Sequence, residues 1–313
     1  MNNKTQIAPS FFSVRQLSAV AITAFAYLGL SALLVGFKTD QVFLVVVFAL
    51  CYFLTPITRK LILGFSIFIV YWIIFDYMKV VPNYRVNDVH IQSLYEAEKH
   101  LFGIRVDGVL LTPNEYWQHF HRSFLDVASG IFYLTWVPVP LGFAAYLFFK
   151  NKKEFLYFSL TFLLVNLIGF VIYYVYPAAP PWYVAEHGFT FIRDTPGNTA
   201  GLSRFDVFFN TGIFKSIYEK SSNVFAAMPS LHSSYPLIVF YYGLRNRLGA
   251  INILFATLML GIWFSAVYTS HHYVLDVIAG ILCAITGIRL FLLMATKNKF
   301  IIKILDNYRT VIS

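Results

Sequence analysis

The sequence predicts an all-α, polytopic integral-membrane helical bundle, and two observations carry this prediction. First, 58% of the 313 residues are hydrophobic and only 12% are charged, whereas a soluble domain carries about 25% charged residues. Second, the apolar residues gather in runs long enough to cross a hydrocarbon core of about 30 Å. Lipid forces backbone groups to pair within each segment, and the alternating strands typical of a membrane β-barrel are not seen. The composition argues against a soluble enzyme, a disordered chain and a secreted disulfide scaffold.

Eight apolar runs are candidate membrane spans. Their predicted ranges are 18–37, 41–56, 61–81, 124–149, 155–176, 224–243, 249–268 and 273–295. The second run is at the short end of what crosses a membrane, and Pro138 and Pro140 predict a kink in the fourth. Two long connections, 82–123 and 177–223, mix aromatic, proline and charged residues, as interfacial segments do. No internal repeat or linker divides the chain, so we expect a single membrane domain over 1–313.

Basic residues are distributed unevenly between the two sides that eight spans would define. The side with both termini holds two acidic residues, Glu154 and Asp306, and 13 basic ones. These basic residues are Lys4, Arg15, Arg59, Lys60, Lys150, Lys152, Lys153, Arg245, Arg247, Lys297, Lys299, Lys303 and Arg309. The positive-inside rule places this side in the cytoplasm. The long connections then face the periplasm of a bacterial inner membrane, or the Golgi lumen in a eukaryote.

The candidate chemistry lies in two histidine segments that begin the sixth and eighth spans. AAMPSLHSS holds His232, and YTSHHYVLD holds His272 and Asp276. Ionisable residues at or inside a span are costly and are therefore functional candidates. The four-residue spacing predicts that His272 and Asp276 share one helix face. There the carboxylate would accept a hydrogen bond from the ring and leave the other nitrogen as a nucleophile. His232, on the opposite side, would act as general acid and then as base.

These two segments, which the span order places at one membrane level, resemble the phosphatidic acid phosphatase type 2 superfamily of histidine phosphotransferases. Within it, the inositol phosphorylceramide synthase branch is most similar, with sphingomyelin synthases as more distant relatives. YPAAPPWY at 176–183 and GLSRFD at 201–206 resemble features of this branch. The resemblance implies a six-helix catalytic core over about 110–295, preceded by about two extra spans within 1–81.

The resemblance also implies roles for the histidine segments and shows a departure. It makes His272 the nucleophile, Asp276 its orienting carboxylate, and His232 the acid and base. The phosphatases carry a Lys…Arg-Pro element, but this chain has no Arg-Pro dipeptide. They also carry an arginine six residues before the nucleophile, where this chain has Ala266. Arg204 is the candidate replacement for these cations, because a guanidinium grips phosphate oxygens in a bidentate fashion.

Each further substrate-binding candidate has a structural alternative beside it. The remaining candidates are Ser230, His271, Trp182, Tyr183 and Lys215. For Arg204 an ordinary ion pair in a loop is an equal alternative, and His271 either binds a headgroup or faces the interface. Trp182 and Tyr183 either contact substrate or anchor the chain at the lipid headgroups. The histidines and Asp276 also offer metal ligands. Adjacent histidines project in different directions on a helix, however, so we expect no metal.

The expected activity is transfer of a phospho-headgroup, phosphoinositol by resemblance, from a glycerophospholipid to ceramide. A phosphohistidine intermediate would split the displacement into two easier steps and release diacylglycerol, without metal or organic cofactor. The expected partners are phosphatidylinositol, ceramide and the membrane, and no nucleic acid. A lipid phosphate phosphatase with water as acceptor is the enzymatic alternative. A histidine-containing transporter is the non-enzymatic one, although it requires polar residues in mid-span and most ionisable groups here lie at span ends.

Overall fold

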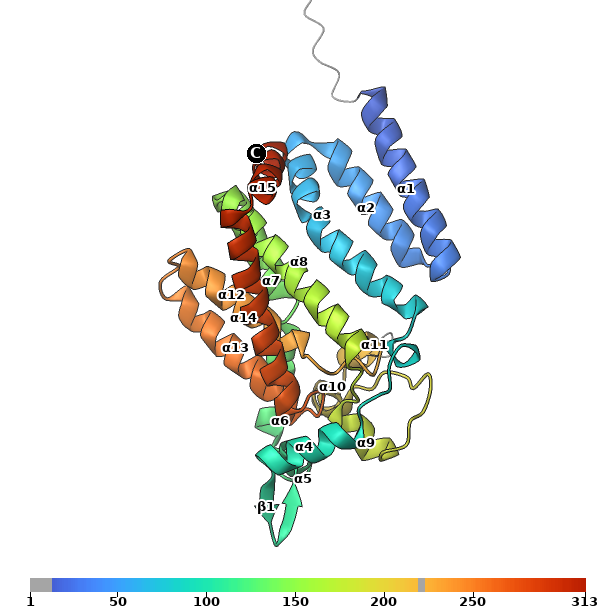
Figure 1. Ribbon diagram of the computed structural model, residues 1–313, viewed down its shortest axis with the longest axis vertical. Coiled ribbons are helices and arrows are strands. Elements are labelled where there is room, and N and C mark those ends of the chain that lie inside the picture. Colours follow the sequence, from blue (N-terminus) through green and yellow to red (C-terminus); the bar gives the residue numbers. More distant parts are fainter. Residues whose placement is uncertain (1–12, 219–222) are drawn as a thin grey trace, which may run out of the picture. The chain divides into compact units, whose positions relative to one another are not determined.

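The computed structural model describes residues 13–218 and 223–313, and helices make up nearly all of its regular structure (Figure 1). Lys4, counted above on the cytoplasmic side, lies outside the described residues. The long helices are α1 (Val14–Leu34), α2 (Thr39–Leu54), α3 (Pro56–Tyr77), α6 (Ser123–Leu134), α7 (Pro138–Lys150), α8 (Lys152–Val175), α12 (Leu231–Arg245), α13 (Ile251–Tyr268), α14 (Val274–Lys297) and α15 (Lys299–Ile312). The shorter helices are α4 (Gln92–Phe102), α5 (Pro113–His119), α9 (Pro181–His187), α10 (Ser203–Phe209) and α11 (Ile213–Tyr218). The 3-10 helices are Met78–Val80, Asn83–Arg85 and Ala200–Leu202. The all-α membrane fold predicted from composition is confirmed.

The chain divides into two compact units, one of residues up to Val80 with 310–313, and one of residues 81–309. In the first unit α2 packs against both α1 and α3. The hydroxyls of Ser31 and Tyr77 lie 2.8 Å apart and join α1 to α3. Thr55 caps the start of α3 directly before Pro56, the arrangement favoured at a helix N-terminus.

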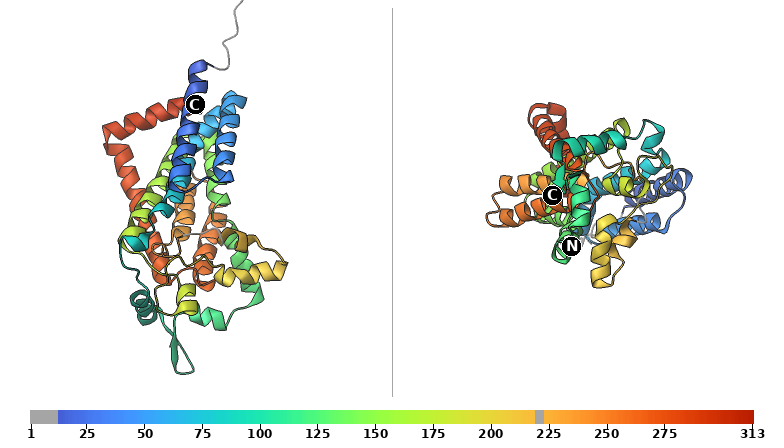
Figure 2. Two further views of the ribbon diagram at one scale, coloured as in Figure 1. Left: turned by 90° about the vertical axis from the view of Figure 1, so that its right-hand side faces the viewer. Right: turned by 90° about the horizontal axis from the view of Figure 1, so that it is seen from below.

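In the second unit α12 packs against α7, α8, α13 and α14, and these helices run side by side (Figures 1 and 2). Several polar side chains inside this bundle pair with one another, because lipid offers them no partners. Tyr242 of α12 shares a hydrogen bond of 2.7 Å with Thr161 of α8. Tyr235, two turns earlier, donates to the side-chain oxygen of Asn166 at 2.6 Å. These bonds hold α12 against α8 without any exposed polar group.

Among the described residues, six helical stretches are long and apolar enough to cross a membrane, and they cover six of the eight predicted spans. The second predicted span is the 16-residue helix α2, about 24 Å long at 1.5 Å per residue. The sixth predicted span begins late, because only Leu231–Arg245 is helical and residues 223–230 form irregular backbone. The predicted kink in the fourth span is confirmed, since α6 ends at Leu134 and α7 begins at Pro138.

A two-stranded hairpin, β1 (Ile104–Val106) paired antiparallel with β2 (Val109–Leu111), was not among the predicted elements. Asp107 and Gly108 connect the strands with φ angles of 50° and 84°. Aspartate followed by glycine between two alternating runs is the strongest short-range signal for such a hairpin. The sequence signal was therefore present, within a connection predicted as interfacial.

Gly280 in α14 marks the closest approach between α12 and α14. A Cβ at this position would lie 2.1 Å from the carbonyl oxygen of Ser230, a backbone atom that cannot rotate away. The Ser230 amide donates to the Asp276 carbonyl at 2.9 Å, and the Ser234 hydroxyl donates to the Gly280 carbonyl at 2.7 Å. The start of α12 is thus fastened to the first turns of α14.

We expect Gly280→Ala to lower the free energy of unfolding by about 1–3 kcal/mol, because the added methyl group forces the two backbones apart. Gly142→Ala in α7 is the matched control, since no atom lies within 4 Å of its Cβ position. The control is expected to be neutral or slightly stabilising. Thermal unfolding of both variants in detergent checks this, and equal melting temperatures would contradict the close approach.

Candidate active site

The proline-rich segment joins, through its backbone, the stretches of chain that carry the two histidine motifs. Ala178 accepts a hydrogen bond of 3.2 Å from the amide of Ala227, within the first motif. The Trp182 amide donates to the carbonyl of Ser270 at 3.1 Å, within the second. Segments far apart in sequence are thereby held in one framework next to the ends of α8, α13 and α14 (Figure 1).

His232 and His272 face each other across the site. Nδ1 of His232 lies 3.1 Å from Nε2 of His272, and the ring planes are inclined by 54°. His232 is in the first turn of α12, and His272 lies on the turn between α13 and α14. The indole of Trp136 packs edge-on against the His232 ring, with 4.5 Å between the centroids. The structure therefore brings together the two histidines that were predicted to act as a pair.

The other ring nitrogen of His272 meets a backbone carbonyl instead of the predicted carboxylate. Nδ1 lies 3.0 Å from the carbonyl oxygen of Ala227 but 3.6 Å from Oδ2 of Asp276, which is too long for a hydrogen bond. A carbonyl only accepts, so Nδ1 carries the hydrogen and Nε2 keeps a lone pair. The predicted geometry was wrong because α14 begins at Val274. His272 therefore precedes the helix and shares no helix face with Asp276.

Asp276 is fully buried and caps the helix that it belongs to. Its Oδ2 accepts the amide of Tyr273 at 2.8 Å, while Oδ1 has no hydrogen-bond partner. The carboxyl group thus lies close to His272 without a hydrogen bond to its ring. Its role as the orienting group of the nucleophile stays a prediction.

Burial lowers the pKa of both adjacent histidines, His271 and His272. Desolvation lowers the pKa of His272 to about 4, and the hydrogen bond to the Ala227 carbonyl opposes this only in part. Burial also lowers the pKa of His271 well below its ordinary value, reinforced by the charges of His272 and His232. Both rings on this turn are therefore neutral at pH 7, the state in which an imidazole nitrogen can attack.

Glu98 of α4 holds the start of α14 and was missed in the sequence analysis. Its fully buried carboxylate accepts the amides of Val274 at 2.9 Å and Leu275 at 3.1 Å. Burial raises its pKa to about 7, although the two amides oppose this. When ionised, this carboxylate lies where the helix dipole favours a negative charge. One signal was available in the sequence, since Glu98 follows the buried Leu94 by one helical turn.

Asn114 of α5 fixes the same turn from the other side and was also missed. Its side-chain amide donates to the carbonyls of Val267 at 2.8 Å and His272 at 2.9 Å. The amides of His271 and His272 both donate to the carbonyl of Ala266, at 3.1 and 3.0 Å. The backbone of the predicted nucleophile is therefore anchored at both its amide and its carbonyl.

His271 and Ser230 are buried beside the pair. Nδ1 of His271 lies 3.0 Å from the Thr269 hydroxyl, whereas its Nε2 is buried without a partner. The His271 ring is 5% exposed and packs against Tyr218, so it does not face the membrane interface. Ser230 is fully buried, and its hydroxyl accepts from Ser233 at 3.0 Å. A substrate-binding role for either residue stays a prediction.

Arg204 forms an ion pair and still keeps one nitrogen unused. Its Nε donates to Oδ1 of Asp126 at 2.5 Å, and the Tyr268 hydroxyl donates to the same oxygen at 2.8 Å. Nη2 of Arg204 is buried and has no partner. The two alternatives for Arg204, a loop ion pair and a phosphate ligand, are thus compatible. Lys215 is exposed on α11, and its amide donates to Asp206 at 2.9 Å.

Trp182 and Tyr183 lie inside the protein, not among exposed interfacial side chains. Both are buried with Ile91, Ala179 and Phe225 in one hydrophobic cluster. The Tyr183 hydroxyl donates to the Thr190 carbonyl and accepts from the Ile192 amide, each at 2.8 Å. Their headgroup-anchoring alternative is therefore wrong, because these side chains support the connection between α9 and α10. A direct contact with substrate stays a prediction.

Within residues 13–218 and 223–313, no group of three or more histidine, cysteine, aspartate or glutamate side chains is arranged to hold a metal ion.

Comparison with known proteins gives one matching family and several relatives. The PAP2 superfamily model matches residues 105–290. The phosphoinositol dihydroceramide synthase of Bacteroides thetaiotaomicron is 44% identical over 277 residues, which cover 88% of this chain and 91% of that protein. The inositol phosphorylceramide synthase of Candida albicans is 28% identical over 255 residues, or 78% and 50% of the two chains. The catalytic subunit of inositol phosphorylceramide synthase of Schizosaccharomyces pombe is 27% identical over 242 residues, or 74% and 53%. The chain thus spans about half the length of these two fungal relatives, and no solved structure matches it.

The matched region contains both histidine segments, the proline-rich segment and every residue of the site described above except Glu98. The extent of this match and the identity to the bacterial relative confirm the resemblance predicted from the motifs. The chain belongs to the PAP2 superfamily, within which it is similar to inositol phosphorylceramide synthases.

Proposed function

We propose that this protein is a lipid phosphotransferase that moves the phosphoinositol headgroup of phosphatidylinositol to the primary hydroxyl of a ceramide or dihydroceramide and releases diacylglycerol. The observation that carries the proposal is the 3.1 Å contact between the ring nitrogens of His232 and His272. The carbonyl of Ala227 beside it leaves the lone pair of His272 on the nitrogen in this contact. The names of the bacterial and fungal relatives support the substrate class.

In the first step, Nε2 of His272 attacks the phosphorus of the donor lipid. A phosphorus–nitrogen bond forms and the phosphorus–oxygen bond to diacylglycerol breaks, while His232 gives its proton to the departing oxygen. An in-line displacement needs the attacking and leaving atoms on opposite sides of the phosphorus. The headgroup therefore enters between the two rings and replaces their direct contact.

In the second step, the ceramide hydroxyl attacks the same phosphorus from the side that diacylglycerol left. His232 takes the hydroxyl proton, the phosphorus–nitrogen bond breaks, and His272 returns to its neutral state. Both steps pass through one site, and the proton taken up in the second replaces the proton given in the first. Splitting one displacement in this way is the general advantage of a covalent intermediate.

We place the site at the non-cytoplasmic face of the membrane. His232 is at the start of α12, and Arg245 ends the same helix, about 20 Å away at 1.5 Å per residue. Arg245 belongs to the basic side of the chain and pairs there with Glu154 at 2.8 Å. The positive-inside rule assigns that end to the cytoplasm, which supports a periplasmic site in a bacterium.

Incubating the purified protein with phosphatidylinositol, in the presence and absence of labelled ceramide, tests the proposal. We expect labelled inositol phosphorylceramide and an equal amount of diacylglycerol when both lipids are present, with little headgroup released when ceramide is omitted. Replacing phosphatidylinositol by phosphatidylcholine should abolish the product. Rapid release of headgroup without ceramide would instead identify a phosphatase that uses water.

His272→Asn should reduce transfer by at least about 1,000-fold, because it removes the attacking nitrogen. The asparagine amide can still donate to the Ala227 carbonyl, so the melting temperature should change little. His119→Asn, at an exposed position of α5, is the matched control and should keep full activity. Turnover of the His272 variant at the unsubstituted rate would exclude His272 as the nucleophile.

Glu98→Ala should lower both stability and transfer, because two amides at the start of α14 lose their acceptor. We expect a loss of about 1–3 kcal/mol in the free energy of unfolding, the range for an unsatisfied buried group. Glu96→Ala is the control. Glu96 is exposed on the same helix, and its carboxylate accepts a hydrogen bond from the neighbouring Gln92 side chain. Melting temperatures and initial rates of the two variants compare them. Indistinguishable values would show that α14 does not depend on Glu98.

A further inference from the structure

We propose that the Tyr133 hydroxyl binds an oxygen of the transferring phosphoryl group, together with Nη2 of Arg204. This inference rests on the proposed function and adds the groups that hold the phosphate. It gives the site a phosphate-binding residue that the motifs do not contain.

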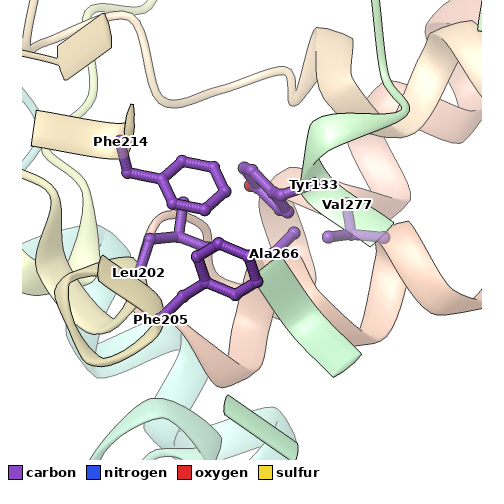
Figure 3. Packing of buried hydrophobic residues seen from close by; sticks show 6 residues of the cluster. All are labelled: Tyr133, Leu202, Phe205, Phe214, Ala266 and Val277. Carbon is purple, nitrogen blue, oxygen red and sulfur yellow. The ribbon is translucent and has the colours of Figure 1, made fainter. Parts of the chain in front are cut away.

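Tyr133 stands directly beside both histidine segments. It is in the last turn of α6, is 1% exposed, and packs with Phe205, Phe214 and Ala266 in one cluster (Figure 3). Its ring centroid is 5.4 Å from that of His232 and 5.5 Å from that of His271. A ligand held between the catalytic rings is therefore within reach of this phenol.

The Tyr133 hydroxyl is buried without a hydrogen-bond partner. Three other buried or partly buried phenols of the second unit are paired. Tyr235 donates to Asn166, Tyr242 to the Tyr157 carbonyl and Tyr268 to Asp126. Buried polar groups in folded proteins are nearly always satisfied, and an exception calls for a ligand or a bound water. The position of this exception, beside the histidine pair, indicates the ligand.

Tyr273 is the other buried phenol without a partner among the described residues, but it belongs to a different cluster. It packs with Leu94, Ala178 and Ala227, toward α4. Tyr133 instead contacts the rings of His232 and His271. The two unpartnered phenols are thus on different sides of the turn, and Tyr133 is the one on the side of the histidine pair.

The unpartnered nitrogen of Arg204 lies near the same place. The Gly201 amide donates to the Thr269 carbonyl at 2.9 Å. A Cβ at Gly201 would lie 2.7 Å from the Cα of Thr269 and 2.9 Å from Nη2 of Arg204. The guanidinium therefore borders Thr269, whose hydroxyl bonds to His271 at 3.0 Å.

One phenol and one guanidinium therefore lie beside the histidine pair, each with an unused donor. The transition state of phosphoryl transfer spreads negative charge over its peripheral oxygens, which such donors stabilise when they are already in place. Arg204 supplies a guanidinium group, and Asp126 holds its other edge so that Nη2 remains available. Tyr133 supplies a directed hydrogen bond without a further charge to desolvate.

Tyr133→Phe in the full-length protein tests this assignment, with Tyr242→Phe as the matched control. We expect Tyr133→Phe to lower kcat/KM for transfer at least 10-fold and to leave the melting temperature unchanged or raised, because it removes a hydroxyl without a protein partner. Tyr242→Phe removes a hydroxyl bonded to the protein. It should lower the melting temperature and keep the rate within twofold.

A second measurement uses orthovanadate, a mimic of the phosphoryl transition state, and needs no acceptor lipid. Orthovanadate should raise the melting temperature of the unsubstituted protein and of Tyr242→Phe, but much less that of Tyr133→Phe. Transfer by Tyr133→Phe within twofold of the unsubstituted rate would overturn the inference, as would an equal orthovanadate shift. A fall in its melting temperature or a failure to fold would do so too, by showing that the hydroxyl has a structural role. If the unsubstituted protein makes no inositol phosphorylceramide, the proposed function fails, and the orthovanadate shifts still decide the role of Tyr133.

Discussion

The hydrogen bond between Nδ1 of His272 and the carbonyl of Ala227 is the contact on which the rest of the site depends. It places the hydrogen on one ring nitrogen and the lone pair on the other, so that the free nitrogen faces His232. The carbonyl itself is held by the backbone bond between Ala227 and Ala178 in the proline-rich segment. One acceptor thereby links three sequence motifs, and a displacement of any of them would change the direction of the lone pair.

Holding a turn of neutral histidines at the end of a helical bundle requires support from several elements. Glu98 fixes the start of α14, and Asn114 fixes the carbonyls of the turn. Both residues come from the long connection after α3, which also contains the hairpin. This connection is therefore part of the site, and its polar side chains Glu98 and Asn114 bond to the backbone around the turn. Buried backbone groups need partners, and at the end of a membrane helix only the protein supplies them reliably.

Asp126, Arg204 and Tyr268 form a compact polar group next to the turn that carries the histidines. Asp126 accepts from both Arg204 and Tyr268, so the buried carboxylate and the half-buried guanidinium neutralise each other. Removing one partner of a buried pair is costly, because it leaves an uncompensated charge. In the proposed reaction, a phosphate oxygen binds Nη2 of Arg204 and the pair stays intact. Low polarity around the group strengthens each of these interactions.

Much of the architecture could be predicted from local patterns. Apolar runs predicted the positions of the helices, because the length of such a run can be read from consecutive residues. Pro138 and Pro140 predicted the break between α6 and α7. The late start of α12 could not be predicted in this way, since residues 225–227 leave the helix to bond with Ala178. The four-residue spacing of His272 and Asp276 led to a wrong geometry, because α14 begins only at Val274 and His272 lies before it.

By itself, the sequence determined the membrane fold class, the superfamily and the pair of histidines that meet, because each follows from composition or from short motifs. Only the tertiary structure decided which atom orients His272, which carboxylate holds the start of α14, and which unpartnered polar atoms lie beside the histidine pair. Those contacts involve backbone carbonyls and side chains from distant segments, such as Ala227, Glu98 and Tyr133. No spacing along the chain encodes them, since they arise only when the helices pack.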